Sequence, residues 1–513
     1  MRILFVYPEY PDTFWSFKHA LKFIAKRAAY PPLGILTVAA MLPAQWEQRL
    51  IDMNVSTLRN EDIAWADYIF ISAMSVQRAS SRAVIDRCHA LGATVVVGGP
   101  LFTSRPEEFD DVAYQVLNEA ELTLPPFLAD LQAGQARHRY SSDAWADVQT
   151  TPIPRWDLLN MKNYASMCVQ FSRGCPFDCE FCDITVLYGR TPRTKSAAQV
   201  IAELDSLVRA GWRGGVFFVD DNFIGNKRVV KQEILPSITA WMTRHHHPFY
   251  FLTEASINLA DDEQLMRQMT AAGFNSVFVG IETPNEESLQ ECGKVQNRNR
   301  DLLSSVHILQ QHGLQVQGGF IVGFDSDDPL SIFDRLIAFI QESGIVTAMV
   351  GLLNAPYGSR LHTRMKAEGR LVEEDMTGNN TDGSTNFIPK MNAEVLANGY
   401  RAIVDSIYSP RQYYARVKNF LSEYRPCPAG VPHFGIEHVL ALFKAGFVLG
   451  IVEKERVYYW RLLFWSLFRR PRSLHLAIIL SIFGFHFRKS FEQSTKLMLE
   501  NAQMVKREVG SVV

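Results

Sequence analysis

Three cysteines lie within eight residues, and their type and spacing are the strongest chemical signal in the sequence: Cys175, Cys179 and Cys182. Thiolates are soft ligands that suit zinc or iron–sulfur clusters. A structural zinc site uses four ligands, commonly two pairs of cysteines or histidines at short spacing. No histidine lies near the three cysteines, and no second cysteine pair follows them. Cys168 is the nearest other thiol, but it falls in an apolar strand, where cysteine is a core residue. A four-iron cluster held by three cysteines leaves one iron open, which suits catalysis.

The cysteine loop directly follows a predicted strand, so parallel β-structure must position it. Six predicted strands alternate with amphipathic helices over residues 160–365, which indicates a partial (β/α)6 barrel with its active site at the strand carboxyl ends. The expected strands are 167–172, 215–219, 249–254, 276–281, 315–322 and 345–352. Cysteines at the mouth of such a barrel favour a chemical role over three unrelated loop cysteines.

Residues 1–150 also alternate apolar strands with helical segments, which indicates a parallel sheet covered on both faces. The expected strands are 3–7, 49–52, 68–72, 94–97 and 113–117. This order fits a Rossmann-like or flavodoxin-like α/β sheet, although no Gly-x-Gly-x-x-Gly dinucleotide fingerprint follows any strand. Residues 135–165 are predicted to be a linker, and residues 366–513 a mainly helical domain.

Composition limits the functional classes. The 513 residues are 47% apolar and 21% charged, with a net charge of −2, which argues against a nucleic-acid partner bound through global basic charge. Seven cysteines are too few, and odd in number, for a disulfide framework. The N-terminus does not have the pattern of a signal peptide, and no apolar run reaches roughly 18 residues. We therefore expect a cytoplasmic chain with reduced cysteines.

The pattern Cys-x-x-x-Cys-x-x-Cys, with aromatic Phe181 before the last cysteine, resembles the signature of the radical S-adenosylmethionine superfamily. The resemblance implies a 4Fe–4S cluster whose open iron chelates the amino and carboxylate groups of S-adenosylmethionine. Reductive cleavage would release a 5′-deoxyadenosyl radical that abstracts hydrogen from the substrate. The resemblance also implies an electron donor such as flavodoxin or ferredoxin.

Polar and glycine-bearing strand ends resemble the S-adenosylmethionine contacts of the same superfamily. A capping acid or a packing glycine explains each of them equally well when it is taken alone. Their order on consecutive strands favours the cofactor. The predicted S-adenosylmethionine-binding residues are Phe181, Asp220, Asp221, Glu254, Glu282, Gly319, Ile321 and Gly323.

The N-terminal sheet ahead of the barrel resembles the cobalamin-binding branch of this superfamily. The sequence segments 11–17, 31–34 and 408–410 resemble those of one subgroup, which includes hopanoid C-2 methylase and the bacteriochlorophyll side-chain methylases. Its members share a C-terminal domain of unknown function. The cobalamin-binding residues implied by the resemblance are Ser72, Met74, Gly98, Gly99, Pro100 and Glu119. The cobalt-ligating Asp-x-His-x-x-Gly motif is missing, and His19 does not replace it. We favour a cobalt without a lower histidine over a domain that has lost the cofactor.

Residues 456–489 carry seven basic residues, no acidic residue and many interleaved aromatics. This composition suits an interfacial segment on anionic lipid, and equally an amphipathic helical hairpin with a solvated basic face. It therefore leaves open a peripheral contact with the inner face of the membrane.

The sequence as a whole predicts a cobalamin-dependent radical S-adenosylmethionine methyltransferase acting on an unactivated carbon of a hopanoid-, tetrapyrrole- or lipid-like substrate. The predicted domains are 1–150 (cobalamin-binding), 160–365 (radical barrel) and 366–513 (helical). One alternative is a radical cyclase, coupling or oxidising enzyme that transfers no methyl group. The other is a non-catalytic protein that binds cobalamin or associates with a membrane.

Overall fold

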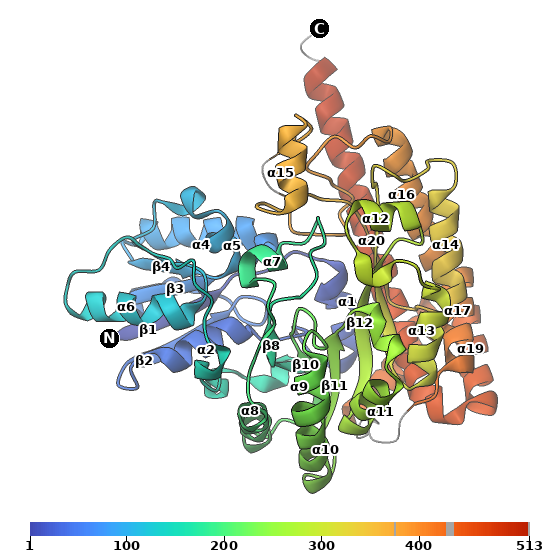
Figure 1. The fold of residues 1–513 in the computed structure, drawn as a ribbon, viewed down its shortest axis with the longest axis horizontal. Coiled ribbons are helices and arrows are strands. Elements are labelled where there is room, and N and C mark those ends of the chain that lie inside the picture. The colour runs from blue at the N-terminus through green and yellow to red at the C-terminus, as the bar shows by residue number, and fades with distance from the viewer. Residues whose placement is uncertain (374–375, 427–435, 511–513) are drawn as a thin grey trace. The chain divides into compact units, whose positions relative to one another are not determined.

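The computed structural model describes residues 1–373, 376–426 and 436–510 (Figure 1). The chain folds into two compact units. The first comprises Met1–Pro11, Lys26–Pro176 and Asp183–Phe249, and the second comprises Asp12–Ala25, Phe177–Cys182 and Tyr250–Val513. Cys175 therefore belongs to the first unit, and Cys179 and Cys182 belong to the second.

A six-stranded parallel sheet begins the first unit, in the order β2-β1-β3-β4-β5-β6. Its strands are β1 (Arg2–Tyr7), β2 (Glu47–Asp52), β3 (Tyr68–Ser72), β4 (Val95–Gly98), β5 (Tyr114–Val116) and β6 (Arg139–Tyr140). The five predicted strands are confirmed to within two residues, and β6 lies in the predicted linker. Strand order reverses between β1 and β3, and doubly wound sheets bind ligands beyond the carboxyl ends at such a reversal.

Helices cover both faces of this sheet (Figure 1). One face packs against α3 (Asn60–Trp65), α4 (Arg78–Ala90) and α5 (Pro100–Ser104), and the other against α2 (Leu33–Met41) and α6 (Ala120–Gln132). Leu4 and Val6 enter the first core, while Ile3 and Phe5 enter the second, because successive strand side chains point to opposite faces. Two short 3-10 helices lie in the connections of this sheet: η3 (Ser75–Gln77) after β3, and η4 (Pro106–Phe109) before β5.

The predicted linker is ordered. It contains η5 (Val148–Thr150), η6 (Trp156–Leu158) and η7 (Met161–Asn163). The backbone amide of Arg155 donates to the carbonyl of Leu36 at 3.1 Å, and the Tyr164 hydroxyl donates to Asp52 Oδ2 at 2.9 Å. These bonds connect the linker to the N-terminal sheet.

The remainder of the first unit surrounds the start of the cysteine loop. The expected strand 167–172 is interrupted, with β7 (Ser166–Val169) followed by β8 (Ser172–Arg173), which pairs antiparallel with β9 (Arg193–Thr194). Strand β10 (Gly214–Phe218) runs parallel to β7. The helices are α7 (Ile184–Tyr188), α8 (Ala197–Arg209), α9 (Lys227–Val229), the π-helix η8 (Val230–Ile234) and α10 (Leu235–Arg244).

Four further strands pair in parallel and in chain order: β11 (Phe249–Glu254), β12 (Phe274–Glu282), β13 (Gln315–Val322) and β14 (Ala348–Leu352). All four lie in the second unit, apart from the first residue of β11. The intervening helices are η9 (Ile257–Asp261), α11 (Glu263–Ala272), α12 (Glu286–Glu291), η10 (Val295–Asn297), α13 (Leu302–Gln311) and α14 (Ile332–Ser343). The predicted alternation of strands and helices over 160–365 is therefore present.

The C-terminal region of the second unit is helical, as predicted. It comprises α15 (Arg360–Ala367), α16 (Ala393–Tyr408), α17 (Pro410–Glu423), α18 (Ile436–Phe447), the π-helix η12 (Val448–Val452), α19 (Arg456–Arg469), η13 (Pro471–Ser473) and α20 (Leu474–Gly510). The same unit contains η1 (Phe14–Ser16), α1 (Lys18–Leu21) and η2 (Lys22–Ile24). Among the described residues, no helix combines the length and apolar character needed to cross a membrane.

The structure divides the predicted interfacial segment 456–489 into an exposed and an internal part. In α20, Leu480 and Phe487 are fully buried, and the Phe487 ring stacks on Phe14 with centroids 4.2 Å apart. These side chains belong to the core. The exposed apolar side chains of the segment instead lie on α19, and further exposed apolar side chains lie on α18 and η12, which precede the segment.

Candidate cofactor site

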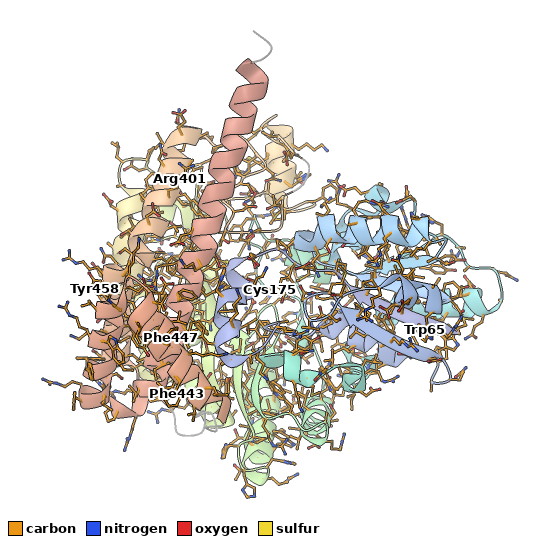
Figure 2. All side chains as sticks on the ribbon, turned by 180° about the vertical axis from the view of Figure 1, so that it is seen from behind. Trp65, Cys175, Arg401, Phe443, Phe447 and Tyr458 are labelled. Atoms are coloured by element: carbon orange, nitrogen blue, oxygen red, sulfur yellow. The ribbon has the colours of Figure 1, made fainter. Side chains whose placement is uncertain are left out.

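Cys175 follows a turn that requires glycine at the preceding position (Figure 2 labels Cys175). Gly174 has φ +92°, and a Cβ at this residue would meet carbonyl oxygens of residues 188–191 at 2.9–3.0 Å. The Cys175 amide donates to the Gly189 carbonyl at 3.3 Å, and Asn222 Nδ2 donates to Cys175 Sγ at 3.9 Å. The local backbone thus positions this thiol and supplies it with an amide donor.

Two carboxylates just after β10, the buried Asp220 and the partly buried Asp221, hold the segment that leads into Cys175. Asp220 accepts hydrogen bonds from the amides of Phe171 and Ser172 and from the Ser172 hydroxyl. Asp221 accepts from the Gly174 amide at 2.8 Å. Burial raises the pKa of Asp220 to about 7 and that of Asp221 to about 6. These contacts indicate a positioning role, and direct contact with S-adenosylmethionine stays a prediction.

A buried charge network connects the loop after β5 to the cysteine loop. Arg173 donates to Glu119 at 2.9 Å and to both carboxylate oxygens of Glu121, and Arg193 donates to both oxygens of Glu119. Burial raises the pKa of Glu121, but hydrogen bonds and the charge of Arg173 outweigh it and lower that pKa to about 2. Glu119, predicted as a cobalamin contact, is nearly fully buried and engaged by two guanidinium groups.

In the second unit, the segment around Cys179 is anchored on both sides. Gln296 Nε2 donates to the buried Cys179 Sγ at 3.7 Å. The next residue, Glu180, accepts two hydrogen bonds from Arg364 of α15, at 2.7 and 3.0 Å. Such paired guanidinium–carboxylate bonds give geometric specificity. A side chain from the C-terminal region therefore holds the middle of the cysteine motif.

β12 ends at a glutamate with a strained backbone conformation, and buried polar groups surround its carboxylate. Glu282 has φ +64° and accepts from Lys294 Nζ at 2.5 Å. Burial lowers the pKa of Lys294, but the charges of Glu282 and of Cys179 and Cys182 raise it above its ordinary value. Asn297 Nδ2 donates to the carbonyls of residues 280 and 281 at 3.0 and 2.9 Å.

Two buried amide oxygens here have no hydrogen-bond partner among the described residues: Gln296 Oε1 and Asn297 Oδ1. Buried polar atoms are normally hydrogen-bonded, so unpartnered acceptors indicate a missing donor. S-adenosylmethionine carries an amino group and an adenine N–H group, and it therefore fits the chemistry of these groups.

The other predicted S-adenosylmethionine residues lie in the cysteine loop, at the end of β11, and on or just after β13. Phe181 and Ile321 pack on one apolar cluster. A Cβ on Gly319 would meet a phenylalanine ring of β12 at 2.8 Å, which shows that the strand packs closely there. Gly323 follows β13 with φ +106°, and Glu254 ends β11, partly exposed. Their contact with the cofactor stays a prediction.

The predicted cobalamin residues gather at the carboxyl ends of β3 and β4. Ser72 and Gly98 are paired in register. Gly99 has φ +90°, and a Cβ there would lie 2.4 Å from Ser72 Oγ. Pro100 begins α5, and Met74 is 45% exposed. Glycine backbone beside a hydroxyl lets a bulky ligand approach closely, so this edge fits a corrinoid.

No histidine lies between β1 and η1 to serve as a lower cobalt ligand. His19 belongs to α1 in the second unit, where its ring lies 5.7 Å from that of His486. Polar groups instead occupy the ends of β1 and β2. Asp52 accepts from Tyr164, and burial raises the pKa of Asp52 above its ordinary value.

The thiol chemistry of the cysteine motif fits an iron–sulfur cluster. Among residues 1–373, 376–426 and 436–510, no three His, Cys, Asp or Glu side chains converge as ligands for one metal ion. In a cluster each thiolate binds a different iron, so convergence on one point is not required. The donor set is three cysteine thiols, with amide hydrogen bonds to two of the sulfurs.

Sequence reasoning missed the residues that hold the motif. They are Arg173, Arg193, Lys294, Gln296, Asn297 and Arg364. The available signal was position, because residues 294–297 follow the fourth barrel strand. Arg364 lies in a helical segment with no motif, 184 residues beyond its partner Glu180.

Comparison with known families agrees with this architecture. Residues 26–128 match the B12 binding domain, residues 169–336 the radical SAM superfamily, and residues 359–498 a domain of unknown function, DUF4070. The fold resembles OxsB, a cobalamin-dependent S-adenosylmethionine radical enzyme, with a TM-score of 0.63 at 14% identity over 98% of this chain and 80% of OxsB. It also resembles the methyltransferase TsrM from Kitasatospora setae, with a TM-score of 0.59 at 13% identity over 96% of this chain and 99% of TsrM. The predicted fold class is confirmed.

Sequence relatives define the family. An uncharacterized methyltransferase of Synechocystis is 40% identical over 99% of this chain and 94% of its own length. Hopanoid C-2 methylase of Rhodopseudomonas palustris is 35% identical over 74% of this chain and 73% of its own length.

The chain therefore belongs to the cobalamin-binding radical S-adenosylmethionine family. Within that family it is a methyltransferase whose cofactors are a 4Fe–4S cluster, S-adenosylmethionine and cobalamin. This assignment rejects the non-catalytic alternative.

Proposed function

We propose that this chain methylates an unactivated carbon of a hydrophobic small molecule, such as a hopanoid, a tetrapyrrole or another lipid-like compound. The observation that carries the proposal is the 35% identity to hopanoid C-2 methylase. Two bacteriochlorophyllide d methyltransferases of Chlorobaculum tepidum, 23% and 22% identical over 67% of this chain, support the same substrate class. The names of these relatives refer to large hydrophobic substrates, and we propose a substrate of the same class for this chain.

The three cysteines would hold the cluster, and bound S-adenosylmethionine and cobalamin would supply radical and methyl-carrier chemistry. Asp220 and Asp221 hold the loop that presents Cys175 through the bonds described above. Gln296 and Asn222 donate to the sulfurs of Cys179 and Cys175, and such hydrogen bonds tune cluster potential.

Binding of the other two cofactors would use the ends of several strands. The Glu282–Lys294 pair and the free oxygens of Gln296 and Asn297 would orient S-adenosylmethionine. The Ser72 hydroxyl and the glycines at 98–99 would seat cobalamin. The proposed domain bounds are those of the sequence, namely 1–150, 160–365 and 366–513. A reductant of the flavodoxin or ferredoxin type would deliver electrons.

The test is anaerobic reconstitution with iron, sulfide and cobalamin, followed by incubation with S-adenosylmethionine, a reductant and candidate hopanoids or bacteriochlorophyllides. We expect 5′-deoxyadenosine together with a product heavier by about 14 mass units per transferred methyl group. A product of unchanged carbon count would support a radical reaction without methyl transfer and refute the proposal. Absence of methylation across both substrate classes, with 5′-deoxyadenosine still formed, would refute the substrate class alone.

A further inference from the structure

Helices α18, η12 and α19 expose a stripe of large apolar side chains, which we call the α18–α19 face. Its main residues are Phe443, Phe447, Ile451, Val457, Phe464 and Phe468. Phe443 is 72% exposed and Phe468 is 78% exposed. Figure 2 labels Phe443 and Phe447, which follow each other along α18. Large contiguous exposed apolar surfaces mark sites of interaction with another surface.

The opposite sides of the same helices are already buried. In α18 and η12, Ala441, Ala445 and Leu449 face the core at a spacing of four residues, while the exposed residues 443, 447 and 451 repeat at the same spacing on another side. In α19, Tyr459, Leu462 and Ser466 are buried, while Phe464 and Phe468 are exposed. A soluble surface helix normally has one apolar stripe. Among the residues that the structure describes, the second stripe remains exposed and is available to another surface.

The charge of the α18–α19 face indicates what covers it. Residues 439–473 carry seven basic and two acidic side chains. One of the acids, Glu455, is buried in an ion pair with Arg488. Exposed arginines occur in the same part of the sequence, including Arg461 and Arg469 of α19 and Arg472 of η13. Aromatic side chains with a surrounding basic rim are typical of helices that lie in an anionic lipid interface.

We propose that the α18–α19 face docks on the surface of an anionic lipid bilayer, with its phenylalanines in the acyl boundary and its arginines at the headgroups. A second copy of the chain fits less well, because a two-fold contact would place the same arginines against each other. The proposal places the membrane contact on 439–472, outside α20. It does not depend on the substrate proposed above, because binding to vesicles is measured without turnover.

The experiment is co-sedimentation of the full-length chain with vesicles of phosphatidylcholine alone or with about 30% phosphatidylglycerol. We expect binding to the anionic vesicles and weak binding to the neutral ones. The triple variant Phe443→Ser, Phe464→Ser, Phe468→Ser should lose about fivefold or more in the bound fraction, because it removes three of the four exposed phenylalanines of the face. Its matched control, Leu330→Ser, Val372→Ser, Ile388→Ser, changes equally exposed apolar residues elsewhere and should bind like the parent.

A charge series separates lipid electrostatics from apolar adhesion. Arg461→Gln, Arg469→Gln, Arg472→Gln should weaken binding to anionic vesicles and leave the residual binding to neutral vesicles unchanged. The control Lys162→Gln, Arg209→Gln, Arg244→Gln removes the same charge elsewhere and should have no effect. Equal binding by the parent and by the phenylalanine variant would overturn the proposal. So would failure of the parent to bind vesicles, combined with a dimer or a flavodoxin complex that the phenylalanine variant abolishes.

Discussion

Glu119→Gln distinguishes two roles for one residue. The resemblance to cobalamin proteins assigns Glu119 to the corrinoid, whereas in the structure Arg173 and Arg193 engage both of its carboxylate oxygens at 2.8–2.9 Å. Its side chain is 2% exposed and those of the two arginines are 12% and 17% exposed. Arg173 lies two residues before Cys175, so the pair positions the cluster loop.

The expected cost follows from burial. Removing one partner of a buried ion pair costs about 3–5 kcal/mol because the other charge is left uncompensated. Arg173 keeps Glu121, and glutamine keeps one oxygen acceptor, so we expect the low end, about 3 kcal/mol. For a unit of this size that corresponds to a decrease of roughly 6–12 °C in Tm. Iron bound after reconstitution should also fall, because the loop before Cys175 loses its anchor.

The assay is thermal unfolding together with iron content and cobalamin affinity, each measured on the same preparation. Glu108→Gln is the control, because Glu108 forms more exposed ion pairs with Arg78 and Arg105, and it should cost less than about 1 kcal/mol. A Glu119→Gln protein with unchanged Tm and iron content but weakened cobalamin binding would refute the positioning role and restore the corrinoid contact.

Three further predictions test other parts of the site. Cys179→Ala should abolish iron binding and 5′-deoxyadenosine formation. The control Cys88→Ala removes a buried thiol of α4 and should retain iron. Retention of iron by Cys179→Ala would contradict the ligand assignment. Gly99→Ala should weaken cobalamin binding at least tenfold, because its Cβ would lie 2.4 Å from Ser72 Oγ. The control is Gly92→Ala: Gly92 also has a positive φ, but the space around it is open, so this variant should bind cobalamin normally. Burial lowers the pKa of His486 to about 4, so the unfolded chain takes up its proton at higher pH than the folded chain, and stability should fall by up to about 3 kcal/mol as the pH drops from 6.5 to 4. Urea unfolding of His486→Gln at pH 7 and pH 4.5 should show a smaller difference than the parent, and an identical difference would argue against this residue.

Much of the fold could be predicted because its signals are local. Apolar runs such as Ile69–Ile71 and Val95–Val97 have to be buried on both faces of a sheet, and their alternation with helices restricts the topology. The pattern of apolar residues did not predict that the strand expected at 167–172 is interrupted. There, Asp220 binds the amides of Phe171 and Ser172 and redirects the chain toward the cysteines.

The sequence by itself determined the ligand chemistry of this protein: three thiols at covalently set spacing, and glycines at positions 99 and 174, where a positive φ and close neighbouring atoms favour a residue without a Cβ. Tertiary structure alone decided what surrounds them. Gln296 reaches Cys179 across 117 residues and Arg364 reaches Glu180 across 184, distances over which residue type carries no information about partners. It also decided that Phe487 and Phe491 of α20 are buried while the phenylalanines of α18 and α19 are exposed. These helices all carry several aromatic residues, and only the packing of each helix face determines which aromatic side chains remain available to a membrane.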